Sequence, residues 1–382
     1  MKILGKVRVT GLLFFGAVAL VCVLTWIAKK EVSVSDAGLG ENTIKRINAH
    51  KDGKVFYSSL SNVLSAAKNS KATKKYYWIG ASQLYAINDF RLGDRTAPYI
   101  VFDNLYKNDI ELFTLSYPNA YPSEFLIVAQ HILANTKADG LILGAVYDDM
   151  REKGIRTQIS KAVQNENTRL ELSKSPFGKE LLSQSDAVLN SYQSEKVGKK
   201  ATASLMDKTE LAITGFIEEH FNAESIRREG RGQVTLYIIK IRQFIEGLRA
   251  RYTRDISNYN YPIPEDRYAQ NWMAWTEILK IAQIKKVPVL IYIAPRPTDF
   301  FPYNKSNYKK FKKSLRKIAD FYEASFINLE DLVSSSMFGM VDTNFGFLVR
   351  DPFHFQGQGH ALLAKEVTKA VKRFNNSKFS HK

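Results

Sequence analysis

The feature that most constrains the fold is an alternation of short apolar runs with segments of helical periodicity. The apolar runs are residues 76–80, 110–115, 140–147, 287–293 and 325–329. Between them, apolar side chains such as Phe125, Val128 and Ile132 recur at helical spacing. Strands separated by helices predict a mainly parallel sheet with helices on both faces. We therefore predict an α/β fold of three α/β/α layers around a five-stranded sheet.

One long segment interrupts this alternation. Residues 150–262 are mostly helical in pattern, charged and poor in strand signals, whereas residues 71–149 and 263–375 carry the apolar runs. The pattern predicts one α/β domain, residues 71–149 and 263–375, interrupted by a helical insertion at residues 150–262.

The N-terminal region predicts a membrane anchor. Residues 9–28 carry no charged side chain and are long enough to cross a hydrocarbon core. Basic residues precede the run, which favours a cytoplasmic tail of residues 1–8 and an extracytoplasmic main part. Residues 29–70 then form a polar juxtamembrane stalk. The expected location is the inner or plasma membrane, with a single span and a periplasmic or cell-surface C-terminal domain; a cleaved signal peptide is the alternative.

The charge balance indicates an anionic partner. The chain has 55 Lys and Arg against 38 Asp and Glu, a net charge of +17. Such an excess favours anionic lipid headgroups, an anionic cell-surface polymer or nucleic acid, and an extracytoplasmic location argues against nucleic acid. The basic run at residues 305–317 is by default a solvated helix face, and attraction to an anionic membrane or polymer is its second interpretation.

Polar residues follow four of the predicted strands, where α/β proteins place their sites. Ser82 ends the stretch Gly-Ala-Ser at residues 80–82, and Asn119 and Ala120 end the stretch Pro-Asn-Ala. Ser82 is the candidate nucleophile. The candidate donors to an oxyanion are the backbone N–H groups of Ser82, Asn119 and Ala120, together with the Asn119 side-chain amide.

The two remaining strand ends supply candidate substrate contacts. Asp148 follows the third strand, and Arg296 follows the fourth in the stretch Ala-Pro-Arg. The paired carboxylates of Asp148 and Asp149 also allow a metal site, although the sequence shows no obvious further ligand. Arg296 suits an anionic substrate and equally suits a solvated loop.

A serine hydroxyl is a poor nucleophile until a base takes its proton, and the usual base is a histidine oriented by a carboxylate. The chain has six histidines. His354 stands out because Asp351 lies three residues before it, in what we predict to be a loop before the last helix. His360 is interpreted as an ordinary residue of that helix.

The motif Gly80-Ala81-Ser82 after the first strand, with Asp351-x-x-His354 before the last helix, resembles the SGNH/GDSL hydrolase superfamily. The sequence Gly-Ala-Ser-Gln, the Pro-Asn-Ala turn and the membrane anchor are similar to DltD-type members, the D-alanyl-lipoteichoic acid biosynthesis proteins, and to related accessory proteins of cell-surface polymer acylation. The resemblance covers the two α/β segments. It implies that Ser82 is the nucleophile, His354 the base and Asp351 its orienting acid.

Two positions depart from the superfamily pattern. Ala81 stands where the motif often has an aspartate, and no asparagine follows the third strand. Two functions therefore remain open. The first is a membrane-anchored acyltransferase or esterase that acts on acyl esters of a cell-envelope polymer, beside a membrane-bound O-acyltransferase and without a cofactor or metal. The second is a non-catalytic accessory protein that binds or presents an anionic cell-surface polymer to that acyltransferase.

Overall fold

The computed structural model describes residues 45–46, 60–88, 93–201, 262–298, 303–342 and 348–377. The predicted tail and anchor, and most of the predicted stalk, lie outside the described residues, as does the insertion from residue 202 to 261. Among the helices that the structure does describe, none has the length and hydropathy needed to cross a bilayer.

The chain divides into two compact units. The larger comprises Thr43–Ala201, Asp255–Met340 and Arg350–Lys382, and it contains all the elements described below apart from the ends of two strands. The smaller comprises Met1–Asn42, Thr202–Arg254 and Val341–Val349, and only those strand ends are described in it.

Five parallel strands form the central sheet, as predicted. Their order across the sheet is β4-β2-β5-β6-β7. Their bounds are Ile110–Ser116 for β4, Lys74–Gly80 for β2, Gly140–Ala145 for β5, Val289–Ile293 for β6 and Ser325–Asn328 for β7. The chain winds from β2 to β4 in one direction and returns past β2 to β5. The carboxyl ends of β2 and β5 therefore flank the topological switch point, where doubly wound sheets bind ligands.

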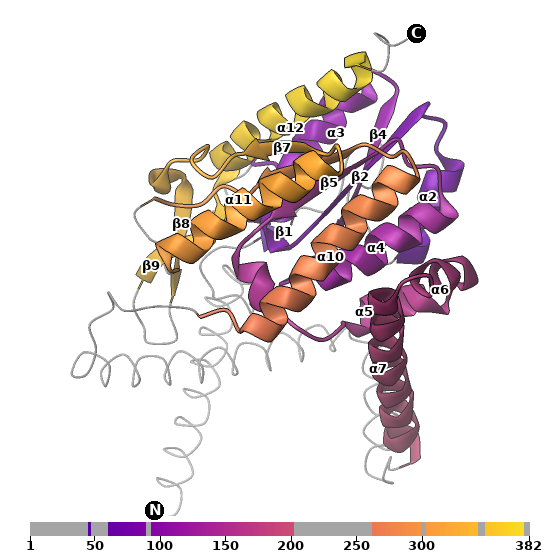
Figure 1. Ribbon diagram of the computed structural model, residues 1–382. Coiled ribbons are helices and arrows are strands. Elements are labelled where there is room, and N and C mark those ends of the chain that lie inside the picture. Colours follow the sequence, from indigo (N-terminus) through magenta and orange to yellow (C-terminus); the bar gives the residue numbers. More distant parts are fainter. Residues whose placement is uncertain are drawn as a thin grey trace, which may run out of the picture. The chain divides into compact units, whose positions relative to one another are not determined.

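Helices cover both faces of this sheet (Figure 1). One layer contains α2 (Leu60–Asn69), α4 (Pro122–Asn135), α10 (Glu265–Ile284) and α11 (Lys305–Phe321), which share one apolar core. The other layer contains α3 (Ala97–Tyr106) and α12 (Gly357–Ser377), which pack against each other. The predicted three-layer architecture is confirmed.

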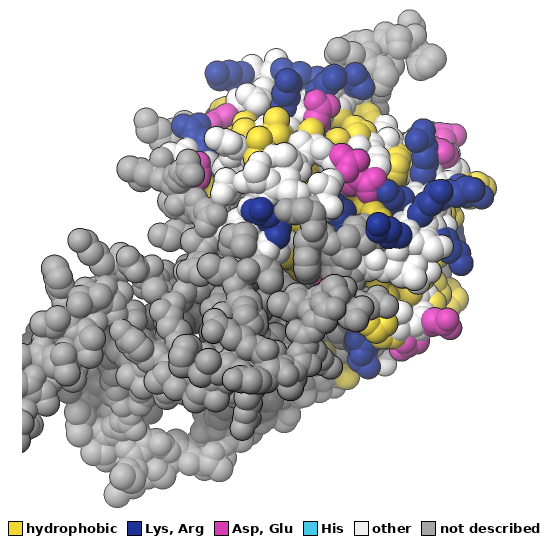
Figure 2. Space-filling view, turned by 90° about the vertical axis from the view of Figure 1, so that its left-hand side faces the viewer, with side chains coloured by type: hydrophobic (Ala, Val, Ile, Leu, Met, Phe, Trp, Pro, Cys, Tyr) yellow, Lys and Arg dark blue, Asp and Glu magenta, His cyan; other side chains and the backbone are white. Residues whose placement is uncertain are grey.

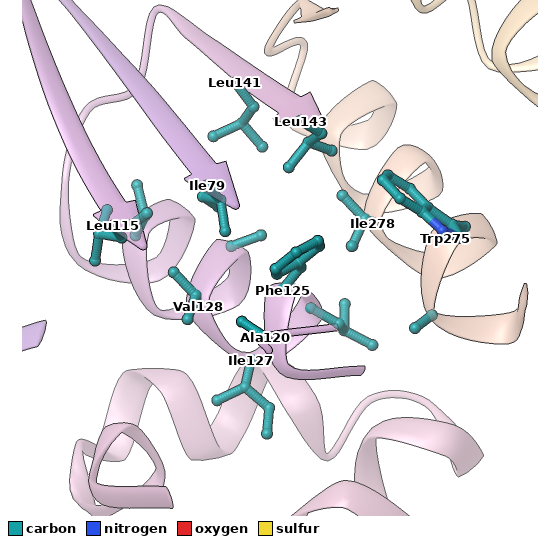
Figure 3. Packing of buried hydrophobic residues seen from close by; sticks show 14 of the residues in the cluster. Ile79, Leu115, Ala120, Phe125, Ile127, Val128, Leu141, Leu143, Trp275 and Ile278 are labelled. Carbon is teal, nitrogen blue, oxygen red and sulfur yellow. The ribbon is translucent and has the colours of Figure 1, made fainter. Parts of the chain in front are cut away.

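The core between the sheet and the first helical layer sets the strand orientation (Figure 3). Ile79 and Leu143 point from the sheet toward Phe125 of α4 and Ile278 of α10. Each of these side chains is at most 1% exposed. Successive residues of a strand face opposite sides, so Trp78 points to the other layer, where its Nε1 donates to Tyr292 Oη at 3.2 Å.

The described part of the predicted insertion is helical. After β5 come η3 (Asp148–Arg151), α5 (Thr157–Ser160), η4 (Lys161–Gln164), α6 (Glu166–Leu172) and α7 (Pro176–Ala201). The alternation of strand and helix resumes with α10.

Two small sheets add to the fold beyond the sequence prediction. Strand β1 (Lys45–Arg46) pairs antiparallel with β3 (Ala86–Ile87), and β8 (Phe338–Asp342) pairs with β9 (Leu348–Phe355). The β9 strand directly precedes α12. Both sheets are formed by segments next to the candidate site residues.

Basic side chains are spread over the surface rather than gathered in one place on the face that Figure 2 shows, and acidic side chains lie between them. No histidine is visible among the coloured residues of that face. The three histidines of the described part, His131, His354 and His360, are all buried.

Candidate active site

Ser82 lies immediately beyond β2, at the carboxyl edge of the sheet and beside the switch point. It begins a short 3₁₀ turn, η2 (Ser82–Leu84). A Cβ at Gly80 would come within 2.7 Å of Leu84, so glycine allows the turn to fold back closely onto the strand end. This local geometry holds Ser82 at the edge of the sheet with its side chain 8% exposed.

Asp351 and His354 lie in β9, which corrects the prediction that they occupy a loop. His354 Nε2 lies 2.8 Å from Ser82 Oγ, and His354 Nδ1 lies 2.9 Å from Asp351 Oδ2. His354 is 7% exposed and Asp351 is 2% exposed, so little water competes for these contacts. The structure thus brings together, in hydrogen-bonding order, the three residues that the sequence analysis singled out.

The hydrogen bonds around Asp351 keep its carboxylate ionised. Burial by itself would raise the pKa of Asp351. The neighbouring His354 ring and the N–H donors of His354 and Phe353 outweigh burial, so its pKa lies below the ordinary value. An ionised Asp351 accepts the Nδ1 proton of His354, which leaves Nε2 free to accept the Ser82 hydroxyl proton.

Two residues that the sequence analysis missed tie the Ser82 segment to β9. Gln83 Nε2 donates to Phe353 O at 2.8 Å and to Pro295 O at 3.1 Å. Asn88 Nδ2 donates to Asp351 Oδ2 at 2.9 Å, and its backbone N–H donates to Phe355 O at 3.2 Å. The sequence signal was slight: a polar residue follows the serine directly, and another ends the short apolar segment after it.

His360 provides a further tie and has no role in proton transfer. Its Nδ1 accepts from the backbone N–H of Ala97 at 3.1 Å, and its Nε2 donates to Ala86 O at 3.0 Å. Burial lowers the pKa of His360 to about 3, so the ring is neutral at physiological pH. It therefore acts as a structural residue of α12, in agreement with the sequence interpretation.

The predicted oxyanion donors differ in where they lie. In the described part of the chain, the backbone N–H of Ser82 donates to no backbone carbonyl. Ala120 points into the apolar core (Figure 3), and its N–H donates to Tyr117 O at 3.2 Å. Asn119 is exposed with a positive φ of 51°, and its carbonyl accepts from Arg156 at 2.6 Å. Of the predicted donors, Ala120 thus uses its N–H within its own turn.

Arg296 borders a small pocket beside the triad. The pocket has about 300 Å³ of empty volume and extends from Gln83 and Phe353 to the ends of β5 and β6. The Arg296 guanidinium lies over the Tyr303 and Tyr308 rings, 4.9 and 4.8 Å from their centroids. Stacking on two aromatic faces fixes the cation at the pocket wall.

Asp148 lies just outside the pocket lining, at the start of η3. Its Oδ1 forms an ion pair with Arg151 at 2.5 Å. Burial raises the pKa of Asp148, and the Arg151 charge opposes that rise. Within the described ranges, no group of three His, Cys, Asp or Glu side chains could hold a metal ion.

No protein-family model matches the sequence, and no curated protein matches it. Among solved structures, a protein assigned as an acylhydrolase from Bacteroides fragilis shares 10% identity over 83% of this chain and 97% of its own, with a TM-score of 0.37. A GDSL-like lipase from Bacteroides thetaiotaomicron shares 11% identity over 82% and 95% of the two chains, with a TM-score of 0.37.

A third similar structure is a carbohydrate esterase family 2 enzyme with its carbohydrate binding domain, from Corynascus thermopiles (Myceliophthora fergusii). It shares 8% identity over 80% of this chain and 67% of its own, with a TM-score of 0.36. Likeness at this level decides neither the family nor the reaction of this chain.

Proposed function

We propose that this protein is a serine acyl-esterase or O-acyltransferase of the SGNH type. The observation that carries the proposal is the continuous chain of contacts from Ser82 Oγ through His354 to Asp351, with separations of 2.8 and 2.9 Å. A buried serine that needed only a structural partner would not require a histidine whose far nitrogen is held by an ionised carboxylate.

The reaction takes place in two halves. Ser82 Oγ attacks the acyl carbonyl carbon while His354 Nε2 takes the hydroxyl proton. The ester C–O bond then breaks, and His354 returns that proton to the leaving alcohol, which gives an acyl-Ser82 ester. In the second half, water or a sugar hydroxyl attacks the acyl carbon and passes its proton to His354. The bond between the acyl carbon and Ser82 Oγ then breaks, and His354 returns the proton to Ser82 Oγ. Water makes the protein an esterase, and a sugar hydroxyl makes it a transferase.

The oxyanion and the substrate need further contacts. The backbone N–H of Ser82 is the proposed oxyanion donor, and the exposed Asn119 amide is a second candidate. Arg296 and Asp148 are proposed substrate contacts, since Arg296 lines the pocket beside the triad and Asp148 lies next to it.

The setting proposed for this chemistry is the outer side of a membrane. The uncharged run at residues 9–28 supports a single-pass anchor, and the net charge of +17 supports an anionic cell-envelope polymer, such as a teichoic acid, as substrate. A membrane-bound O-acyltransferase is the proposed partner and would supply acyl groups to Ser82.

A second candidate function is non-catalytic presentation of such a polymer. It is favoured by the use of the Ala120 N–H inside its own turn, which leaves few oxyanion donors at Ser82. Losing one donor typically costs a factor of about 10²–10³ in rate. The triad geometry makes this the weaker of the two candidates.

A fluorophosphonate probe distinguishes the two functions without knowledge of the substrate. The protein should be labelled, and Ser82→Ala should remove the label while leaving the melting temperature nearly unchanged. Ser185→Ala, at a fully buried serine of α7, is the control and should keep the label. If the folded wild-type protein takes up no probe, the catalytic proposal is wrong.

A further inference from the structure

We propose that Asn88 is a positioning residue for the triad. Its side-chain amide binds the Asp351 carboxylate and keeps it in place to accept the Nδ1 proton of His354. The inference rests on the proposed function of Ser82, His354 and Asp351 and adds a fourth residue to it. Asn88 is not one of the residues that line the pocket, and it reaches the triad through Asp351.

The Asp351 carboxylate accepts hydrogen bonds from two parts of the chain. Its Oδ1 accepts the backbone N–H groups of Phe353 and His354 at 2.9 and 3.0 Å. Its Oδ2 accepts His354 Nδ1 at 2.9 Å and Asn88 Nδ2 at 2.9 Å. Three of these donors belong to β9 itself. Asn88 belongs to the segment that carries Ser82, so its hydrogen bond fixes the position of the Asp351 carboxylate relative to Ser82.

The surroundings of Asn88 leave its amide no alternative position. The side chain is 1% exposed, and the backbone N–H is bound to Phe355 O at 3.2 Å. Gly339 of β8 packs directly against the amide, and a Cβ at Gly339 would overlap it. Glycine at this position therefore preserves the space in which the Asn88 amide reaches Asp351.

This contact has a consequence for the base. A hydrogen-bond donor at Oδ2 stabilises the negative charge of Asp351. It therefore weakens the electrostatic attraction between this carboxylate and the imidazolium form of His354. Without the donor, Oδ2 keeps its contact with His354 Nδ1 and interacts more strongly with the imidazolium form, while Oδ1 stays bound to the backbone N–H groups of Phe353 and His354. The groups that face His354 are Asp351 from β9 and His360 from α12, and the His360 ring is neutral because burial lowers its pKa to about 3.

The test measures the pH dependence of fluorophosphonate labelling and, independently, the titration of His354 by ¹⁵N NMR. The NMR experiment uses histidine-labelled protein, with the His354 signal assigned from His354→Gln. Asn88→Ala should lower the maximal labelling rate about 10-fold and move the midpoint of its pH profile upward.

Gly339→Ala provides a second route to the same change. The added methyl group displaces the Asn88 amide, so this variant should show the same upward shift as Asn88→Ala. In the double variant the space is already vacated, and the shifts should not add. Asn135→Ala is the control: it removes an amide bound to His131 O and Thr168 Oγ1, far from β9 in the sequence, and should leave the His354 titration unchanged.

The outcomes separate the two proposals. If wild-type protein is not labelled but His354 shifts in Asn88→Ala and Gly339→Ala, the positioning role stands and the catalytic function fails. If labelling occurs and both variants give wild-type pH profiles and wild-type His354 titrations, Asn88 is merely structural and the inference is wrong.

Discussion

Ser82 Oγ and His354 Nε2 lie 2.8 Å apart although the two residues are separated by 272 positions in the sequence. One follows the strand β2 in the centre of the sheet, and the other lies in the small β8-β9 sheet before the last helix. Contacts from Gln83, Asn88 and His360 join these two segments at three further points. The proposed chemistry depends on these contacts between the Ser82 segment and the C-terminal part of the chain.

Asp351→Asn should impair the proposed nucleophile without unfolding the protein. An amide at this position can donate to Nδ1 and so favours the wrong tautomer of His354, which removes the acceptor for the Ser82 proton. We expect labelling by the fluorophosphonate to slow by a factor on the order of 10³–10⁴. Asp186→Asn, which affects an exposed pair with Arg169, is the control and should label at the wild-type rate. Equal labelling of both variants would remove Asp351 from the triad.

His360 should make the folded protein less stable as the pH falls below about 6.5. Burial lowers its pKa to about 3, whereas an unfolded chain binds a proton near pH 6.5. The unfolded state therefore takes up the proton first, and the stability is complete above pH 6.5 and declines as the pH falls toward 3. The loss amounts to about 2 kcal/mol by pH 5. Urea unfolding at pH 7 and pH 5 measures the drop in the free energy of unfolding between the two pH values. In His360→Asn this drop should be smaller than in the wild type by about 2 kcal/mol.

The buried pair of Glu124 and Arg156 should show the opposite pH dependence. Glu124 is fully buried at the start of α4, and its carboxylate accepts from the Arg156 backbone and guanidinium. Burial raises the pKa of Glu124 to about 7 even though Arg156 opposes the rise. The folded state thus holds this proton more tightly than the unfolded state, so stability is lost as the pH rises from about 4.5 through 7.

Arg156→Met should therefore destabilise the protein by about 3–5 kcal/mol at pH 8, since it leaves an uncompensated buried carboxylate. The cost should be smaller at pH 5, where Glu124 can stay protonated. Adding Glu124→Gln should recover part of the loss at pH 8, as measured by urea unfolding. A cost independent of pH would show that Arg156 acts through its contact with Asn119 alone.

The exposed face of α11 is the proposed contact for an anionic polymer. Lys309, Lys313 and Lys317 lie on this face and form no ion pair with the described part of the chain. We expect Lys309→Glu with Lys313→Glu to weaken binding to immobilised teichoic acid at least 10-fold, on the basis of about 1 kcal/mol per basic residue near an anionic surface. Fluorophosphonate labelling should not change.

The matched control for α11 is Lys365→Glu with Lys369→Glu on α12, which makes the same change of charge at the same helical spacing. If both pairs weaken binding equally, the polymer responds to net charge and α11 is only a solvated face. This is the default interpretation of its basic run.

The sequence alone determined the architecture and the candidate triad. Short apolar runs and a period of 3.6 residues are local properties of the chain. The runs around Tyr77 and Ile291 therefore predicted strands, and the spacing of Phe125, Val128 and Ile132 predicted a helix. The parallel five-stranded sheet followed from their alternation. Ser82, Asp351 and His354 were found because each lies at a predictable place, beyond the first strand or before the last helix.

Only the tertiary structure decided which groups meet. It placed Asp351 and His354 in a strand, because β9 pairs with β8, and the intervening sequence has no strand signal strong enough to predict that pairing. It turned Ala120 into the core, whereas a turn sequence leaves either direction open. It brought Asn88 to Asp351 across 263 residues. Contacts of this kind depend on how whole elements pack, and no local pattern in the chain encodes them.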